Sequence, residues 1–376
     1  LDEVVVVGYG IQKKQDITGS VVSVGEGKFT EGVNTNAFQM INGKAAGVNI
    51  SQTSSAPGAS TKIQIRGAGS INSSNSALVV VDGLQGVDPS SINPNDIKSI
   101  EILKDASAAA IYGTRAANGV VLITTKGGNK GEMTVKFGAE VGFQSVAKTI
   151  DVLNGKQYME TLNALRLESN NPEGAIYTAE QIAAVGKGTN WQDEIFRVSA
   201  PVQNYQLSIS GGSDKHDYYL GLSYFDQQGV VKLSSLKKYN VRANMNFTPK
   251  TFLRFKFNMN YTRTDGKSTY ENMTGANEAA GPINSALQFD PTLAPGIDPE
   301  TGRYRKNSFI ALDNPQALLY GISPEKQGNS VYGTFTTEIE PFKDFVFTAR
   351  LGATIDSYTE SSYRSRETIN GLASKG

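Results

Sequence analysis

Residues 93–128, NPNDIKSIEILKDASAAAIYGTRAANGVVLITTKGG, contain two apolar runs on either side of an alanine-rich stretch. The runs at 97–104 and 120–126 are rich in Ile, Val and Thr, which favour strands. The stretch at 105–112 predicts a short helix that stops at Gly113. This part of the chain therefore predicts two strands joined through a short helix.

The preceding residues contain similar short elements. Residues 63–67 and 78–83 predict two further strands, and residues 36–46 predict a second short helix. The continuous apolar run Leu78–Val81 favours a strand that is covered on both faces. Together these elements predict a small α+β domain over residues 11–130, preceded by a separate segment at 1–10.

After residue 131 the pattern changes to a period of two, which is typical of strands with one apolar face. About seven such segments follow one another, each of roughly 9–11 residues, the length that a tilted strand needs to cross a bilayer. They lie near residues 133–144, 205–209, 218–224, 239–247, 253–261, 331–339 and 345–355.

The connections between these segments alternate between long and short. We expect short turns at 211–217, 248–250 and 340–344, and long loops at 145–202, 226–238 and 262–329. Outer-membrane barrels have this arrangement, with short periplasmic turns and long outer loops. A soluble antiparallel sandwich with an aromatic core is the alternative.

About seven strands are too few to close a bacterial barrel, which has an even number from eight upward. An open sheet edge inside lipid would leave backbone groups unpaired at a cost of several kcal/mol each. Leu1 is not an initiator Met, and no signal peptide is visible. We therefore expect a chain that is trimmed or mature at its start and is the front part of a longer barrel, residues 131–376 being its first portion.

Composition excludes several classes of function. Lys and Arg total 36, as do Asp and Glu, so the chain has no basic face for nucleic acid. It has no Cys and one His, His216, which leaves too few ligands for a zinc site. No complete dinucleotide or phosphate loop is present. We expect neither an enzyme nor a metal or cofactor.

The first seven residues, LDEVVVV, form an unusual apolar strand. Such a segment is an aggregation hazard unless something pairs with it. It could add to the sheet edge of a partner, or it could be the first strand of the α+β domain. The residues alone leave both interpretations open.

Several longer runs resemble one family. DEVVVVGYG (2–10), KKQDITGSV (13–21) and the run from Gly47 to Gly83, which ends in ALVVVDG, resemble the plug domain of SusC/RagA-type TonB-dependent outer-membrane transporters. Residues 93–128 are the most specific part of this resemblance. The segments WQDEIFR, QNYQLSISGGSDKHDYYLGLSYFDQQGVV and DNPQALL, at 191–197, 203–231 and 313–319, resemble the first barrel segments of that family.

The resemblance implies an N-terminal α+β plug inside a 22-stranded antiparallel transmembrane β-barrel, of which about the first seven strands are present. It implies TonB-dependent import of oligosaccharides or peptides, with a SusD-like surface lipoprotein as partner and energy from TonB with ExbB and ExbD. The expected location is the outer membrane of a Gram-negative bacterium of the Bacteroidota, in contact with lipid and lipopolysaccharide.

The resemblance also implies three sets of site residues. The Ton box, where TonB binds, maps to Asp2, Glu3, Val4, Val5, Val6 and Val7. Plug loops that face the substrate map to Thr53, Ser54, Ser55, Ser60, Ser70, Asn72, Ser73 and Asn75. Coupling between plug and barrel maps to Arg66, Glu101 and Arg115, as a switchable ion pair or as a permanent structural one.

Some questions stay open at this point. Trp191, Tyr158 and Tyr177 could stack on sugars or contact the cap, or WQDEIFR could be a structural anchor. Many family members carry an extra domain before the Ton box, and much of the cavity wall would come from further strands. The alternatives to the importer are a TonB-dependent receptor for siderophores or haem and, from another class, a soluble glycan-binding adhesin.

Overall fold

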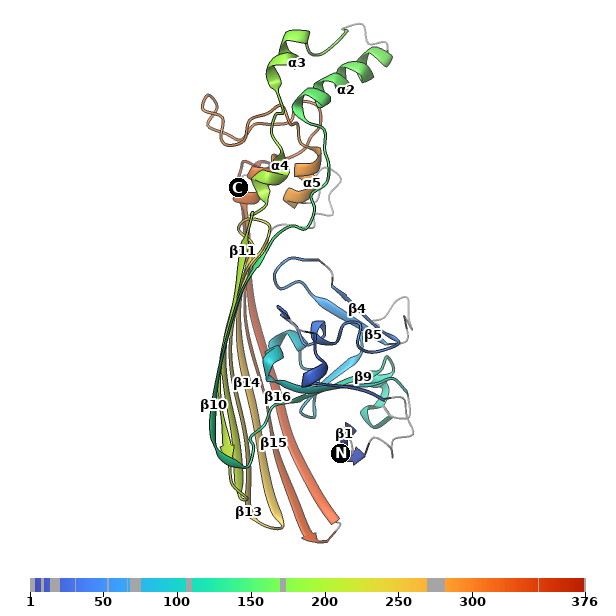
Figure 1. Ribbon diagram of the computed structural model, residues 1–376, viewed down its shortest axis with the longest axis vertical. Helices are drawn as coiled ribbons and strands as arrows, with labels where there is room; N and C mark the ends of the chain where they lie inside the picture. Colours follow the sequence, from blue (N-terminus) through green and yellow to red (C-terminus); the bar gives the residue numbers. More distant parts are fainter. Residues whose placement is uncertain are drawn as a thin grey trace.

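Three bodies make up the computed structural model: a plug, a curved sheet and a helical lobe at one end of that sheet (Figure 1). The structure describes residues 4–7, 10–13, 21–30, 32–52, 54–65, 67, 76–105, 110–169, 174–268, 281–343 and 345–374.

The curved sheet, called the wall sheet below, has seven strands in sequence order, each antiparallel to the next. The predicted number of strands and their order are confirmed. The strands have 13–21 residues and are longer than the predicted 9–11. They are β10 (Gly131–Gln144), β11 (Ala200–Gly212), β12 (His216–Gln228), β13 (Ser235–Lys250), β14 (Leu253–Lys267), β15 (Ile322–Phe342) and β16 (Phe345–Arg364).

The connections alternate largely as expected. Short turns join β11 to β12, β13 to β14 and β15 to β16, and long excursions follow β10 and β14. The prediction of a long loop at 226–238 was wrong. β12 and β13 stay paired as far as Gln228 and Ser235, because both strands continue past the apolar alternation into polar residues that still form a ladder.

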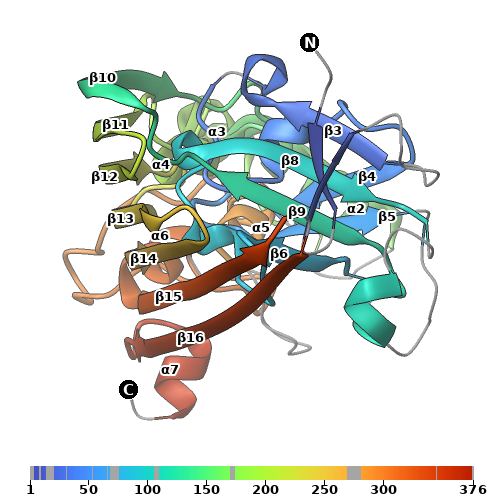
Figure 2. The same ribbon diagram turned by 90° about the horizontal axis from the view of Figure 1, so that it is seen from below.

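The two faces of the wall sheet differ in character. Alternate residues point to opposite faces. The plug lies against the concave face (Figures 1 and 2), and the buried side chains there include the polar residues Asn240, Arg242 and Asn260. The convex face exposes large apolar side chains, among them Leu220, Leu222, Tyr239, Val241, Met245, Phe247, Phe257, Met259 and Phe335.

The plug is built on a five-stranded sheet in the order β3-β8-β9-β6-β7, in which β6 runs parallel to β9. All four predicted strands are confirmed, and every residue of Leu78–Val81 is buried, as expected for a strand covered on both faces. The strands are β3 (Val21–Gly25), β6 (Leu78–Val81), β7 (Leu84–Gln85), β8 (Ile97–Leu103) and β9 (Val120–Thr125).

The helix predicted at 36–46 is reduced to a short 3₁₀ turn. Of the helix predicted at 105–112, residues 106–109 lie outside the described residues. The part that follows is 3₁₀, and Gly113, with φ +69°, interrupts it rather than ending it. The 3₁₀ turns are η2 (Glu26–Lys28), η3 (Gln39–Ile41), η4 (Pro89–Ser91), η5 (Pro94–Asp96) and η6 (Ala110–Ala116).

Two hairpins complete the N-terminal part. One pairs β4 (Val48–Gln52) with β5 (Thr61–Ile65). The other pairs β1 (Val4–Val7) with β2 (Gly10–Lys13) and forms a sheet of its own. The valine-rich segment thus pairs with neighbouring residues and not with the main sheet of the plug.

The helical lobe is formed by the long connections of the wall sheet. Its helices are α2 (Gly155–Glu168), α3 (Ala179–Val185), α4 (Trp191–Ile195), α5 (Gly281–Gln288), α6 (Pro315–Gly321) and α7 (Ile369–Ala373). Among the residues described, no helix is long and apolar enough to span a membrane.

Trp191 anchors this lobe. Its side chain is 1% exposed, packs edge-on against Phe289 at 4.9 Å and donates its indole N–H to the carbonyl of Asp290 at 2.9 Å. Ile195 and Leu319 belong to the same small core. Of the interpretations left open for this residue, the structure favours the structural anchor, because the buried ring has no face for a sugar.

Replacing Trp191 by Ala should loosen the lobe without unfolding the wall sheet. Loss of a buried Trp costs about 3–5 kcal/mol, here confined to the lobe core. Limited proteolysis should then cut within 145–199 while the wall strands stay resistant. Val198→Ala, at a side chain that is 94% exposed, is the control and should leave cleavage unchanged; equal cleavage in the two variants would contradict the anchor role.

Candidate functional site: the contact between plug and wall sheet

The concave face of the wall sheet carries polar side chains beneath the plug. Strand register places Gly221, Arg242 and Asn260 next to one another on β12, β13 and β14. Other buried polar residues on this face are Asn240, Asn244, Thr262, Thr334 and Thr336. Because buried polar groups need partners, this face requires a polar surface opposite it.

The plug supplies that surface first through Asp82. Asp82 and Gly83 have φ of +47° and +84° and join β6 to β7, as an Asp-Gly pair does in a tight hairpin turn. The turn places the Asp82 carboxylate to accept hydrogen bonds from the Thr125 backbone N–H at 3.0 Å and from its hydroxyl at 2.6 Å. The carboxylate is therefore fixed on the plug side.

Arg242 meets this carboxylate from the wall sheet. Its guanidinium group lies 2.7 Å from Asp82, donates to the Thr125 hydroxyl and lies 3.2 Å from the hydroxyl of Tyr332 on β15. The Arg242 side chain is 1% exposed. Removing one member of such a buried pair leaves an unpaired buried charge, which costs about 3–5 kcal/mol.

Asp96 forms a second contact. Its carboxylate accepts the Tyr219 hydroxyl at 2.7 Å, and a Cβ on the neighbouring Gly221 would lie 3.1 Å from that carboxylate, so a glycine leaves room for it. Burial raises the pKa of Asp96, and the opposing effects of Arg242 and of the Tyr219 hydrogen bond are smaller. Burial and the contact therefore act on this carboxyl group in opposite directions.

The third set of contacts holds the backbone of the plug. Lys238 donates to the carbonyls of Thr35 and Ser90 at 2.8 and 3.0 Å. Asn260 and Thr262 both donate to the carbonyl of Ser91, at 3.1 and 2.6 Å. These bonds recognise the path of the plug backbone rather than its side chains.

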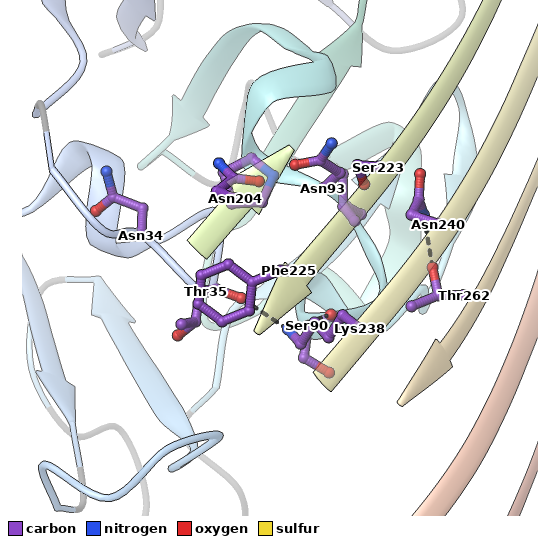
Figure 3. A pocket seen from close by; sticks show the side chains of 12 residues that line it. Asn34, Thr35, Ser90, Asn93, Asn204, Ser223, Phe225, Lys238, Asn240 and Thr262 are labelled. Carbon is purple, nitrogen blue, oxygen red and sulfur yellow. Dashed lines mark hydrogen bonds between the residues drawn. The ribbon is translucent and has the colours of Figure 1, made fainter. Parts of the chain in front are cut away.

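A small cavity lies beside Lys238, between the plug and β11–β14 (Figure 3). Its volume is ≈ 30 Å³, the space of about two water molecules, which is too small for a sugar ring. Asn240 lines it, and the Oδ1 of that side chain has no hydrogen-bond partner. The cavity therefore suits hydration of the contact and not cargo.

The plug loop at 54–60 touches the wall sheet near the lobe. The Pro57 ring lies against Gly229, and a Cβ added to Gly229 would come within 3.0 Å of the ring. Gly58 lies against Leu236, and a Cβ added to Gly58 would come within 3.2 Å of the Leu236 side chain. Within the loop, the Ser54 hydroxyl accepts the N–H of Ala56 at 3.1 Å. The tip of this predicted substrate loop is thus in contact with the β12–β13 connection.

The predicted site residues are placed as follows. Val4, Val5, Val6 and Val7 form β1, Ser54 is half-buried, and Ser55 and Ser60 are exposed. Outside the described residues lie Asp2, Glu3, Thr53, Arg66, Ser70, Asn72, Ser73 and Asn75.

The other residues predicted to couple plug and barrel lie in the plug. Glu101 is 3% exposed in the plug sheet, and among the described residues its polar neighbours Ser99, Ser23 and Lys98 all belong to the plug. Arg115 is exposed on η6. Their coupling role stays a prediction, while the ion pair found between plug and wall sheet is made by Asp82 and Arg242.

Sequence reasoning missed the residues that make this contact, although the sequence carries a signal in each of two segments that contribute to it. The run 238–244 alternates Lys, Asn, Arg and Asn with apolar residues, so its polar face had to meet a partner. Asp82-Gly83 directly after an apolar strand is a hairpin signal that also fixes the position of a carboxylate. No pattern in the chain links these two segments.

The contact described above consists of hydrogen bonds and the Asp82–Arg242 ion pair. Within the described ranges, no group of three or more His, Asp or Glu side chains is placed to hold a metal ion. His216 is exposed at the start of β12, with its Nδ1 3.0 Å from the Ser213 hydroxyl.

Comparison with known proteins fits this geometry. A family model for the TonB-dependent receptor plug domain matches residues 13–120. "TonB-dependent receptor SusC" of Bacteroides thetaiotaomicron is 39% identical over 346 residues, which are 88% of this chain and 32% of that relative. The chain belongs to the SusC family of TonB-dependent receptors. "TonB-dependent receptor P3" of Formosa agariphila is 37% identical to this SusC-family chain. The match covers 94% of this chain and 34% of that relative. The chain thus spans about a third of the length of these curated relatives.

Solved structures confirm the fold class. The RagAB peptide importer in the "open-open" state matches with a TM-score of 0.83 and 25% identity, over 96% of this SusC-family chain and 43% of the other. The unliganded ferric citrate transporter FecA matches at 0.53 with 12% identity, which shows the fold alone. The predicted combination of a plug with the first strands of an antiparallel barrel is therefore correct.

Replacing Arg242 by Met should weaken the docking of the plug on the wall by about 3–5 kcal/mol, because Asp82 stays buried without its counter-charge. The loss is measured by following protease cleavage of the plug as the temperature is raised, and the variant should be cleaved at a lower temperature. Combining the change with Asp82→Asn should restore part of it.

The matched control is Arg254→Met on β14. Arg254 also pairs with two carboxylates, Glu338 and Glu340, but its side chain is 44% exposed, so its pairs are worth about 0–1 kcal/mol. Equal losses from Arg242→Met and Arg254→Met would show that burial of the pair has no special importance.

Gly83→Ala should weaken the same contact by about 1–3 kcal/mol, because the residue has φ +84° and an added Cβ would overlap the Arg350 guanidinium group. The same protease assay measures it. Gly127→Ala, where nothing lies within 4 Å, is the control and should be silent. A silent Gly83→Ala would argue against close docking of this turn.

Proposed function

We propose that this chain is the plug and first barrel strands of a TonB-dependent importer of oligosaccharides or peptides across the outer membrane. The observation that carries the proposal is that the plug has its own buried core and is not built into the wall sheet. Among the described residues, the buried apolar clusters of the plug contain one wall side chain, Tyr332. The hydrogen bonds and the ion pair described above between the two bodies are made by polar side chains of the wall. A domain with its own core and a polar contact can leave without unfolding.

The wall sheet suits a place in the outer membrane. Its convex face is apolar along alternate residues, whereas a soluble adhesin would turn such a face inward. The relatives named above come from Bacteroides and Formosa, which supports an origin in the Bacteroidota. We therefore assign the convex face to lipid and lipopolysaccharide.

Energy enters through residues 2–7 in this proposal. TonB, driven by ExbB and ExbD, adds a strand to the valine-rich segment and pulls on it. The backbone of Val4–Val7 is already extended in β1, as strand addition requires. Pulling then strains the contacts of Asp82, Asp96 and Ser91 with the wall.

The cargo class rests on similarity and on the described loop. The relative named SusC and the structure named a peptide importer both favour nutrients captured with a SusD-like lipoprotein. Residues 54–60, SSAPGAS, carry no charge, and their short hydroxyl groups suit sugar hydroxyls or peptide backbones better than an anionic iron chelate. The substrate-facing role of Ser54, Ser55 and Ser60 is part of this proposal.

A proline in the Ton box should abolish uptake and leave substrate binding intact. Val6→Pro removes a backbone N–H that strand addition uses, so uptake of radiolabelled cargo should fall to background. Val6→Thr keeps the N–H and the β-branched shape and should transport normally. Normal uptake by Val6→Pro would contradict energy entry at this segment.

Purification from outer membranes in mild detergent tests the partner and the cargo. A SusD-like lipoprotein should co-purify, together with a bound oligosaccharide or peptide that mass spectrometry can identify. Recovery without the lipoprotein, from cells that make the receptor only when iron is scarce, would instead support the iron-chelate receptor.

A further inference from the structure

β3 is the edge strand of the plug sheet and pairs only with β8. It is also the first strand of that sheet after the N-terminal segment. If residues 2–7 are pulled as proposed above, the force reaches β3 before any other strand of the sheet. The state of the β3–β8 pair therefore decides whether a pull is passed into the plug.

Beneath this strand lies a buried acid. Register places Glu101 on β8 directly between Ser23 on β3 and Leu122 on β9. Its side chain is 3% exposed, and one carboxyl oxygen, Oε2, has no hydrogen-bond partner. A carboxylate in this place would keep one oxygen buried without a donor among the described residues, which disfavours its charged form.

Around Glu101, β3 contributes the Ser23 hydroxyl, β8 contributes the Ser99 hydroxyl, and β9 contributes the apolar Leu122. Among the described residues, the cation that acts on this carboxyl group is Lys98, which is exposed and lies at the bulge of β8 next to Ser99. Burial raises the pKa of Glu101. The hydrogen bonds from Ser99, from its own backbone and from Ser23, and the charge of Lys98, lower it by less.

We propose that Glu101 is a proton-operated latch for β3. The neutral acid allows β3 to lie on β8. When β3 is drawn away, water reaches the carboxyl group, its O–H bond breaks and the proton passes to water. The resulting carboxylate is well solvated and opposes the return of β3, so the opened plug persists until the acid is protonated again.

The direction of the pH dependence follows from the buried acid. Attachment of β3 raises the affinity of Glu101 for its proton. Its contribution to attachment is therefore fully present below 4.5, the usual pKa of a Glu side chain, and is lost as pH rises through the attached-state pKa. Each pH unit within that window changes the attachment equilibrium by about tenfold.

A second acid close to β3 offers a matched control. Glu26, directly after β3, pairs with Lys126 at 2.7 Å, and its side chain is 63% exposed. Pairs exposed to this degree contribute about 0–1 kcal/mol. Glu26→Gln removes a carboxylate close to β3 without touching the buried one.

Hydrogen exchange of the β3 amides in the detergent-solubilised receptor tests the latch without TonB. Protection factors, which correct for the intrinsic pH dependence of exchange, should fall about tenfold per pH unit through the window in the wild type and in Glu26→Gln. In Glu101→Gln they should be independent of pH. The same fall in Glu101→Gln would overturn the proposal.

A second variant keeps the test decisive if Glu101→Gln does not fold. Ser23→Ala removes a hydroxyl that favours the charged form, so the fall in protection should move to higher pH. An unmoved curve would also overturn the latch. Because no TonB or cargo is present, failure of the latch leaves the proposed import function standing, whereas loss of uptake on Val6→Pro tests that function separately.

Discussion

The buried ion pair between Asp82 of the plug and Arg242 of the wall sheet is the contact on which the arrangement of this chain depends. A guanidinium group in a wall strand at 1% exposure is tolerable only with a carboxylate opposite it. The tight Asp-Gly turn, the Thr125 hydrogen bonds and the Tyr332 hydroxyl all hold that pair in place. The plug therefore sits at one position on the concave face.

Around this pair the contact is polar and partly hydrated, while each body keeps an apolar interior of its own. Buried polar contacts fix position strongly but lose little when water replaces their partners, in contrast to an apolar interface. This combination suits a plug that closes a barrel at rest and can be drawn aside by force. Trp191 and its neighbours give the outer lobe a separate core, so that lobe can keep its shape while the plug moves.

Much of the fold follows from local pattern in the sequence. The period of two after residue 131 was sufficient to count the wall strands, and the apolar runs at 78–81, 97–104 and 120–126 gave the plug strands, because burial enforces those patterns. The helix at 36–46 was overestimated because its alanine content outweighed the turn-forming Gly43. The partner of Arg242 could not be predicted, since it depends on how two independently formed sheets meet.

A reversible cross-link between plug and wall would test the central claim most directly. This chain has no cysteine, and the Leu84 side chain of the plug lies against Gly352 of β16, so Leu84→Cys with Gly352→Cys offers a specific pair. Joining the two thiols with a short reducible linker should stop uptake, and reduction should restore it. Undiminished uptake by the fully cross-linked receptor would show that cargo passes without separation of the plug from this wall.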